Sequence, residues 1–260
     1  MRGGALTPTG EIDPDLVLPR DCQAWLRDTY AAAVSTADRH VGTVLAWLEE
    51  HGLAENTIVA FTSDHGEELF DHGFLGHDHT LYQELVHVPM ILAGPGIAAG
   101  KRVATPVSNR HLAWTLARRG GAKLPGPADP IDLGTPDLIA SRRIHFSTEH
   151  GWWWNDHRTT ILGVLEWPFV LHVYPDALPF GSPKGTQPGE GIVRLYDLVS
   201  DPRETKDLSK EKPELVEALK QSMLEHRRVH AAQRHPMVPG SGEATKEMLR
   251  RLGYAGDEEK

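Results

Sequence analysis

The sequence has a single cysteine and no long apolar run. Cys22 is the only cysteine among 260 residues, so no disulfide can form within this chain. The longest apolar stretches, such as Val88 to Ala93, are far too short to span a membrane. The first eight residues, Met-Arg-Gly-Gly-Ala-Leu-Thr-Pro, lack the apolar core of a signal peptide. We therefore expect no membrane segment and, by default, a cytoplasmic location.

Positive charge is also in deficit. The chain has 27 Lys and Arg against 36 Asp and Glu, which gives a formal net charge of −9. An acidic surface repels both nucleic acid and anionic membranes, so neither is expected as a partner. The hydrophobic fraction of 40% over 260 residues is enough for one large or two modest domains with a substantial core.

Helix and strand patterns alternate in the first half of the chain. From Asp21 onward, apolar residues recur at helical spacing until Gly52, which is a natural helix stop. Residues 57–62 form a short, β-branched apolar run, which predicts a strand buried on both faces of a parallel sheet. Residues 86–92 predict a second buried strand. A helix followed by buried strands is typical of α/β architecture.

The second half of the chain has a different pattern. Gly- and Pro-rich residues 120–136 are interpreted as a linker. Four strands are predicted beyond it, at 143–148, 160–165, 169–174 and 194–198, followed by a helix at 213–228 with Pro in its first turn. The predicted organisation is an α/β core over 1–135, a small α+β subdomain over 136–235 and a weakly ordered tail over 236–260.

The segment Ser63-Asp64-His65-Gly66 is the first that indicates chemistry. It places a carboxylate and an imidazole at the carboxyl end of a predicted buried strand, where ligands of α/β sheets bind. Both side chains can bind a cation. Carboxylate oxygens suit calcium, whereas a neighbouring imidazole shifts the preference toward manganese or zinc. These two residues alone cannot complete a coordination shell.

Four histidines follow in the same polar region: His72, His77, His79 and His87. An imidazole here can hydrogen-bond an anionic ester oxygen or protonate a leaving group near neutral pH. Each of them can equally be a solvated or internally hydrogen-bonded loop histidine. The sequence pattern leaves both interpretations open.

The order of these motifs resembles the sulfatase family. Ser-Asp-His-Gly-Glu at 63–67 is followed by Asp71-His72-Gly73, by Gly-His before Leu-Tyr-x-Glu, and by Val-Pro before an apolar strand. The likeness extends upstream through residues 30–59 and downstream through 195–208 to the helix that starts at Pro213. It therefore covers nearly the whole chain.

The resemblance implies a fold and a site. The fold is an alkaline-phosphatase-like mixed sheet flanked by helices, incomplete in this chain, plus a small C-terminal antiparallel-sheet and helix subdomain. Asp64 and His65 would be ligands of a divalent cation, with calcium favoured and manganese or zinc as alternatives. A histidine would contact the sulfate: His77 by position, with His79 as the alternative. The substrate would be a small-molecule or carbohydrate sulfate ester.

One part of the family pattern is missing from this chain. Sulfatases share a Cys- or Ser-x-Pro-x-Arg segment, whose Cys or Ser becomes the formylglycine nucleophile, and an N-terminal aspartate pair. Neither occurs here, and Arg27 falls one place too late after Cys22. The resemblance thus predicts a metal-dependent sulfatase-type hydrolase of sulfate esters, represented by a part that is inactive alone. The protein partner that we expect is a missing N-terminal half or a second copy of this chain.

Two alternatives stay open. A phosphodiester or phosphonate monoester hydrolase of the same superfamily could use the same Asp-His pair, since the transferred groups share tetrahedral anionic geometry. A non-catalytic remnant that acts as a binding domain is favoured by the missing nucleophile segment. Trp152-Trp153-Trp154 could stack on a carbohydrate or aryl group, or pack between the core and the subdomain.

Overall fold

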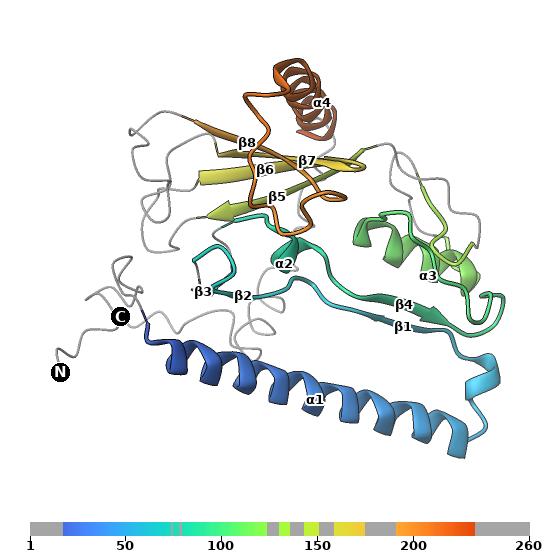
Figure 1. Ribbon diagram of the computed structural model, residues 1–260. Coiled ribbons are helices and arrows are strands. Elements are labelled where there is room, and N and C mark those ends of the chain that lie inside the picture. The colour runs from blue at the N-terminus through green and yellow to red at the C-terminus, as the bar shows by residue number, and fades with distance from the viewer. Residues whose placement is uncertain are drawn as a thin grey trace, which may run out of the picture. The chain divides into compact units, whose positions relative to one another are not determined.

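A computed structural model describes residues 18–73, 75–77, 80–123, 130–135, 143–150, 159–174 and 191–231 (Figure 1). The chain forms two compact units, residues 1–220 and residues 221–260. Several predicted features lie outside the described residues: His79, the boundary near residue 136, Trp152 to Trp154, and the tail 236–260. The account below concerns the first unit, except for the end of the last helix.

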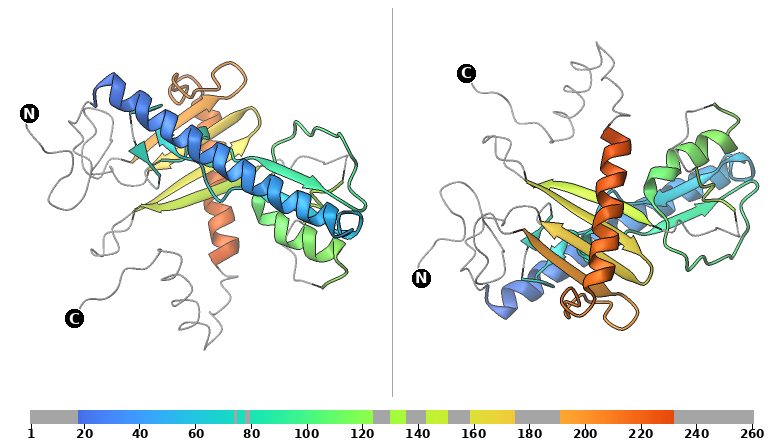
Figure 2. Two further views of the ribbon diagram at one scale, coloured as in Figure 1. Left: turned by 90° about the horizontal axis from the view of Figure 1, so that it is seen from below. Right: turned by 90° about the horizontal axis from the view of Figure 1, so that it is seen from above.

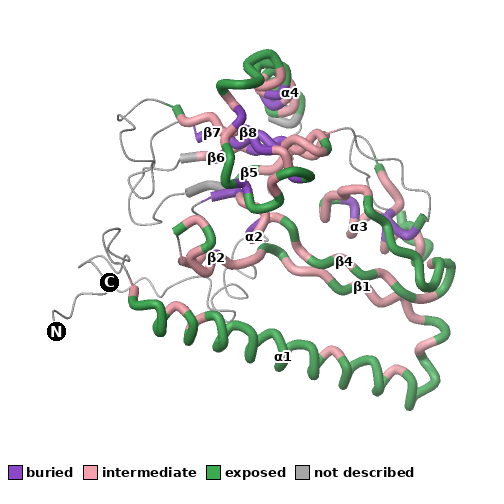
Figure 3. Tube along the Cα trace, viewed as in Figure 1, coloured by how far each residue is buried: buried purple, intermediate pink, exposed green. Residues whose placement is uncertain are grey.

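Helix α1 (Arg20–Glu50) confirms the long helix predicted from the apolar spacing. Pro19 precedes it in an extended conformation, and Asp21 places a negative charge in the first turn, which favours the helix dipole. None of its residues is buried, and Figure 3 shows it exposed along nearly its whole length. Its exposed large apolar side chains are Trp25, Tyr30, Val34, Val44, Leu45 and Trp47. The apolar face predicted from the sequence is therefore solvent-facing in this chain.

The first described sheet differs from the prediction. After the 3₁₀ turn η1 (Ala54–Asn56), strand β1 (Val59–Thr62) pairs with β4 (Met90–Ala93) in antiparallel register, with Val59 opposite Ala93. The expectation of parallel strands buried on both faces is wrong here, because neither strand contains a buried residue. Helix α2 (Gln83–Val86) occupies the start of the predicted second strand, which begins only after Pro89.

Short elements between and after these strands position the loops. Strands β2 (Glu68–Leu69) and β3 (Leu75–Gly76) form a small antiparallel hairpin. The turn η2 (Asn109–His111) leads directly into helix α3 (Leu112–Arg119). The Arg119 guanidinium pairs with Asp132 at 2.9 Å, which ties the end of α3 to residues 130–135.

The C-terminal sheet is antiparallel, as predicted. Strands β5 (Ile144–His150), β6 (Thr159–Glu166), β7 (Phe169–Tyr174) and β8 (Ile192–Asp197) pair in the order β5-β6-β7-β8, and Figure 2 shows them side by side. All three pairings are antiparallel. Fully buried side chains of this sheet form much of the core: Ile161, Val164, Val170, Leu171 and Leu195. Short strands are readable from local sequence, which explains the agreement.

Helix α4 (Pro213–Ala231) begins at the proline predicted for its first turn. Its residues up to Lys220 belong to the first unit, where Leu219 is fully buried. None of the described helices is both long enough and apolar enough to cross a lipid bilayer.

Candidate active site

The loop Ser63-Asp64-His65-Gly66 directly follows β1 and is held by backbone contacts on two sides. The Ser63 carbonyl accepts a hydrogen bond from the Asn109 side chain at 3.1 Å, so the start of η2 supports the loop. The Gly66 N–H donates to the Leu85 carbonyl at 2.8 Å, which joins the loop to α2. Sequence reasoning did not identify Asn109, because its partner lies 46 residues away.

Asp64 is ionised and largely solvent-facing. Its Oδ1 accepts the His65 backbone N–H at 3.0 Å and the Ser63 hydroxyl at 3.3 Å. These hydrogen bonds, led by that of the His65 N–H, lower the pKa of Asp64 below its ordinary value. The side chain is 73% exposed, so its other oxygen can reach a ligand.

The His65 ring has a defined tautomer when it is neutral. Its Nδ1 lies 2.8 Å from the Gly66 carbonyl oxygen, and a carbonyl can only accept, so Nδ1 carries the hydrogen. The lone pair is therefore on Nε2, which lies 3.9 Å from Asp64 Oδ2. A neutral imidazole nitrogen beside a carboxylate oxygen is a donor pair that binds divalent cations.

The structure adds Glu67 and His77 to this pair. The ring of His77 lies 4.3 Å from that of His65, centroid to centroid, and its Nδ1 lies 3.3 Å from Glu67 Oε2. One donor atom from each of His65, Glu67 and His77 falls within 4.8 Å of the other two. The chemistry of this donor set fits a divalent cation. Glu67 was missed by the sequence analysis, although it closes the Ser-Asp-His-Gly-Glu motif.

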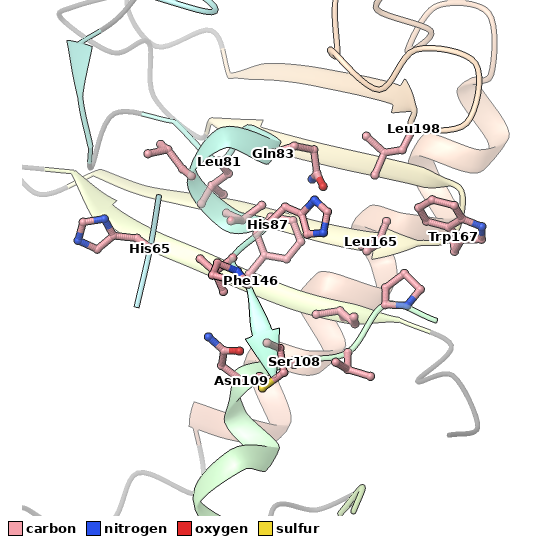
Figure 4. Close-up of a pocket in the computed structure, with 18 of the residues that line it drawn as sticks. His65, Leu81, Gln83, His87, Ser108, Asn109, Phe146, Leu165, Trp167 and Leu198 are labelled. Carbon is pink, nitrogen blue, oxygen red and sulfur yellow. The ribbon is translucent and has the colours of Figure 1, made fainter. Parts of the chain in front are cut away.

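Part of this group lies on the wall of a pocket of about 680 Å³ (Figure 4). Asp64, His65 and His77 all line it, whereas His79 is not among the described residues. His87 lines the same pocket. The structure thus brings together three of the residues predicted for the site.

His72 has a different role. Its Nδ1 is hydrogen-bonded to Glu84 Oε1, and its Nε2 lies 2.9 Å from the Arg203 carbonyl oxygen. Both partners are acceptors, so the ring must donate from both nitrogens and is an imidazolium. Burial is the largest single effect and opposes this charge. The hydrogen bond and charge of Glu84, the Arg203 carbonyl and the charge of Glu204 together outweigh burial and raise the pKa of His72. His72 therefore links the loop that contains it to the segment after β8.

A second buried contact joins α2 to the same segment. Glu204 Oε2 accepts the Gln83 backbone N–H at 2.7 Å, while Glu204 Oε1 lies 3.5 Å from His172 Nε2. Neither ring nitrogen of the fully buried His172 has a hydrogen-bond partner. The rings of Tyr82, Phe146 and Tyr196 contact His172 edge to face. Burial lowers the pKa of His172 to about 3 and raises that of Glu204 to about 7.

Glu204→Gln is expected to change how stability depends on pH. Because the pKa of Glu204 is raised in the folded protein, its contribution to stability is complete below the pKa of 4.5 in the unfolded chain. This contribution is lost as pH rises through the folded pKa of about 7. At pH 4 the free energy of unfolding of the variant should equal that of the parent. At pH 8 it should exceed that of the parent by on the order of 3 kcal/mol, because glutamine cannot ionise. Urea unfolding at pH 4, 6 and 8 measures this. Exposed Glu49→Gln is the control, and parallel curves for both variants would contradict the prediction.

His172→Phe is expected to stabilise the protein by about 1 kcal/mol at pH 7. The ring is fully buried and its nitrogens are unpartnered, so an apolar ring removes a desolvation penalty. The gain should grow below pH 6.5, since a depressed pKa means that stability is lost as pH falls from 6.5 toward about 3. His172→Ala, which leaves a cavity, should instead cost about 3 kcal/mol. Thermal unfolding of both variants at pH 5 and 7 measures these changes in stability. A less stable His172→Phe variant would show that His172 makes a favourable polar contact.

Comparison with known sequences identifies relatives of this chain. A sequence model of the sulfatase family matches residues 10–122. Arylsulfatase K of Canis lupus familiaris is 28% identical over 209 residues, which cover 76% of this chain and 36% of the relative. The chain thus spans about a third of the length of this curated relative.

Solved structures share the fold at low sequence identity. A protein in complex with its substrate D-glucosamine-2-N,6-O-disulfate matches with a TM-score of 0.61 and 22% identity, over 79% of this chain and 41% of that one. The phosphonate monoester hydrolase of Agrobacterium radiobacter matches with a TM-score of 0.67 and 18% identity, over 85% and 45%. The alkaline-phosphatase-like fold expected from the sequence is thereby confirmed.

Proposed function

Because residues 10–122 of this chain belong to the sulfatase family, we propose that the chain is part of a sulfatase-type hydrolase and forms one side of its active site. The observation that carries this proposal is the grouping of Asp64, His65 and His77 on the wall of one pocket. The loop after β1, the support from Asn109 and the contact with α2 hold these residues in place. The proposed reaction is the hydrolysis of sulfate esters.

Asp64 and His65 are proposed to hold a divalent cation. Asp64 offers an ionised oxygen and His65 offers the Nε2 lone pair, as their hydrogen bonds require. Calcium is the ion that the resemblance favours, while the second imidazole and Glu67 nearby suit manganese or zinc. When bound, such a cation supplies positive charge that stabilises the anionic oxygens of the ester.

His77 is proposed to contact the sulfate group. Glu67 accepts from His77 Nδ1 and so fixes the orientation of the ring beside His65. An imidazole N–H in this position can hydrogen-bond an anionic oxygen of the ester. The same carboxylate therefore positions the ring.

The nucleophile is proposed to come from residues outside these 260. No Cys- or Ser-x-Pro-x-Arg segment occurs in the chain, and Cys22 is an exposed residue in the first turn of α1. Without a nucleophile, binding of the ester does not lead to cleavage. The chain by itself is therefore proposed to be inactive. The names of its relatives support a sulfate ester as the substrate.

The test compares the 260-residue chain with the same reading frame extended upstream to include a Cys- or Ser-x-Pro-x-Arg segment. Hydrolysis of 4-nitrophenyl sulfate and of 4-nitrophenyl phenylphosphonate is followed with calcium or manganese. We expect sulfate hydrolysis only by the extended protein, and its loss in Asp64→Ala. Turnover of the phosphonate alone would favour the phosphonate monoester alternative. Asp64-dependent turnover by the 260-residue chain would overturn the proposed inactivity, and no turnover by either protein would favour a binding domain.

A further inference from the structure

The pocket beside Asp64 and His65 has a mixed lining in which apolar side chains predominate. Most of its wall comes from aliphatic and aromatic side chains on three segments: the approach to β4, residues 103–109, and strands β5 and β6. Representative members from these segments are Leu85, Met90, Val103, Val107, Phe146 and Leu165. Its volume of about 680 Å³ is within the range of sites for drug-sized ligands. The wall thus offers a large apolar surface next to the proposed reaction centre.

Charged side chains are scarce on this wall. Among the residues that the structure describes, no lysine or arginine lines the pocket, and Asp64 is its one carboxylate. The other titratable residues on the wall are His65, His77 and His87. On the described part of this wall, a second sulfate or carboxylate of the substrate would therefore meet no lysine or arginine side chain.

Some apolar residues of the pocket lie on the side away from His65. Figure 4 shows His65 on one side and Leu165, Trp167 and Leu198 on the opposite side, with His87 between them in this view. A sulfate group held by His77 beside His65 would therefore direct the rest of the ester along the apolar wall. Burying the rings of an apolar alcohol there is favourable, because it removes apolar surface from water.

We propose that the substrate of this site is the sulfate monoester of an apolar alcohol, such as a fused-ring aryl or alicyclic alcohol, and not a multiply sulfated sugar. This inference rests on the proposed function for the position of the sulfate. It goes beyond that function by assigning the alcohol part of the ester to the apolar wall. His87, the polar side chain between the two sides, is available to hydrogen-bond a hydroxyl or carbonyl group on the ring system.

Equilibrium dialysis tests the ligand class without requiring turnover. The 260-residue chain is dialysed against 2-naphthyl sulfate, 2-naphthol, glucose 6-sulfate and a disulfated hexosamine. We expect 2-naphthyl sulfate to bind at least ~10-fold more tightly than either sugar, and 2-naphthol to bind measurably by itself. Equal or tighter binding of the disulfated hexosamine would overturn the inference.

A charge inserted into the wall provides the matched variant. Val103→Arg changes a pocket residue that is 40% exposed, and Val199→Arg changes a 65% exposed valine that does not line the pocket. We expect the first variant to weaken 2-naphthyl sulfate binding ~10-fold and to improve binding of the disulfated hexosamine, and the second to change neither. Ala104→Arg, on the same wall, replaces Val103→Arg should that variant not fold. An unchanged ligand preference in a folded wall variant would refute the proposal.

Kinetics of the extended protein separate this inference from the proposed function. Hydrolysis of 4-nitrophenyl sulfate without preference for 2-naphthyl sulfate over glucose 6-sulfate leaves the proposed function standing and overturns the inference. Selective binding of 2-naphthyl sulfate that depends on Val103, with no hydrolysis of any ester, supports the apolar ligand class and overturns the proposed function.

Discussion

Gly66→Ala is expected to destabilise the protein by roughly 3 kcal/mol or more. A Cβ at this position would lie 1.8 Å from the Glu84 carbonyl oxygen and 2.9 Å from its carbon. The obstacle is backbone and cannot rotate away, and the hydrogen bond from Gly66 N–H to the Leu85 carbonyl keeps the two segments together. Such overpacking forces the two backbone segments apart, so the loss of folding stability should be larger than for most single substitutions. Urea unfolding at pH 7 measures the loss.

Gly42→Ala is the matched control for this prediction. Gly42 lies inside α1, and a Cβ there meets no heavy atom within 4 Å. Alanine at an exposed helical position should stabilise the protein by up to about 1 kcal/mol. If Gly66→Ala lowers the free energy of unfolding and Gly42→Ala raises it, the loss is due to the close backbone approach at Gly66. A Gly66→Ala protein as stable as the parent would show that the loop and α2 are not held together.

Asp64→Ala is expected to weaken manganese binding by at least ~100-fold. The substitution removes an ionised oxygen beside His65 Nε2, and loss of a supporting group around a metal already costs 10- to 100-fold. Titration of Mn²⁺ followed by its electron paramagnetic resonance signal measures the dissociation constant directly. This readout needs neither a nucleophile nor turnover. Asp38→Ala removes an exposed carboxylate of α1 and should leave the binding unchanged.

Glu67→Gln in the same titration distinguishes two ligand sets. The family resemblance implies Asp64 and His65, whereas the structure groups donor atoms of His65, Glu67 and His77 within 4.8 Å. Binding that is lost in Asp64→Ala and kept in Glu67→Gln supports the first set. The reverse result would assign the cation to the second set and leave Asp64 to another role.

Much of the C-terminal half could be predicted because its signals are local. Short runs of strand-forming residues located β5 to β8 within a few residues, and Pro213 marked the start of α4. The partners of the first strand could not be predicted in this way. Residues 57–62 read as a strand, but the sequence contains no signal for the direction in which residues 86–92 return beside it. The helical period of α1 likewise located the helix without showing that its apolar face would be exposed.

The amino-acid sequence by itself determined which chemistry is present: an adjacent carboxylate and imidazole, Asp64 and His65, after a predicted strand. Only the tertiary structure decided which residues complete the site. Glu67 meets His77 across ten residues, and Asn109 reaches the Ser63 carbonyl across 46. The physical reason is that ligand geometry depends on where loops are held, and these loops are held by contacts distant in sequence, such as His72 with Arg203 across 131 residues. Asp64 and His65 are close together because they are neighbours in the sequence. His77 and Asn109 reach them only through tertiary packing.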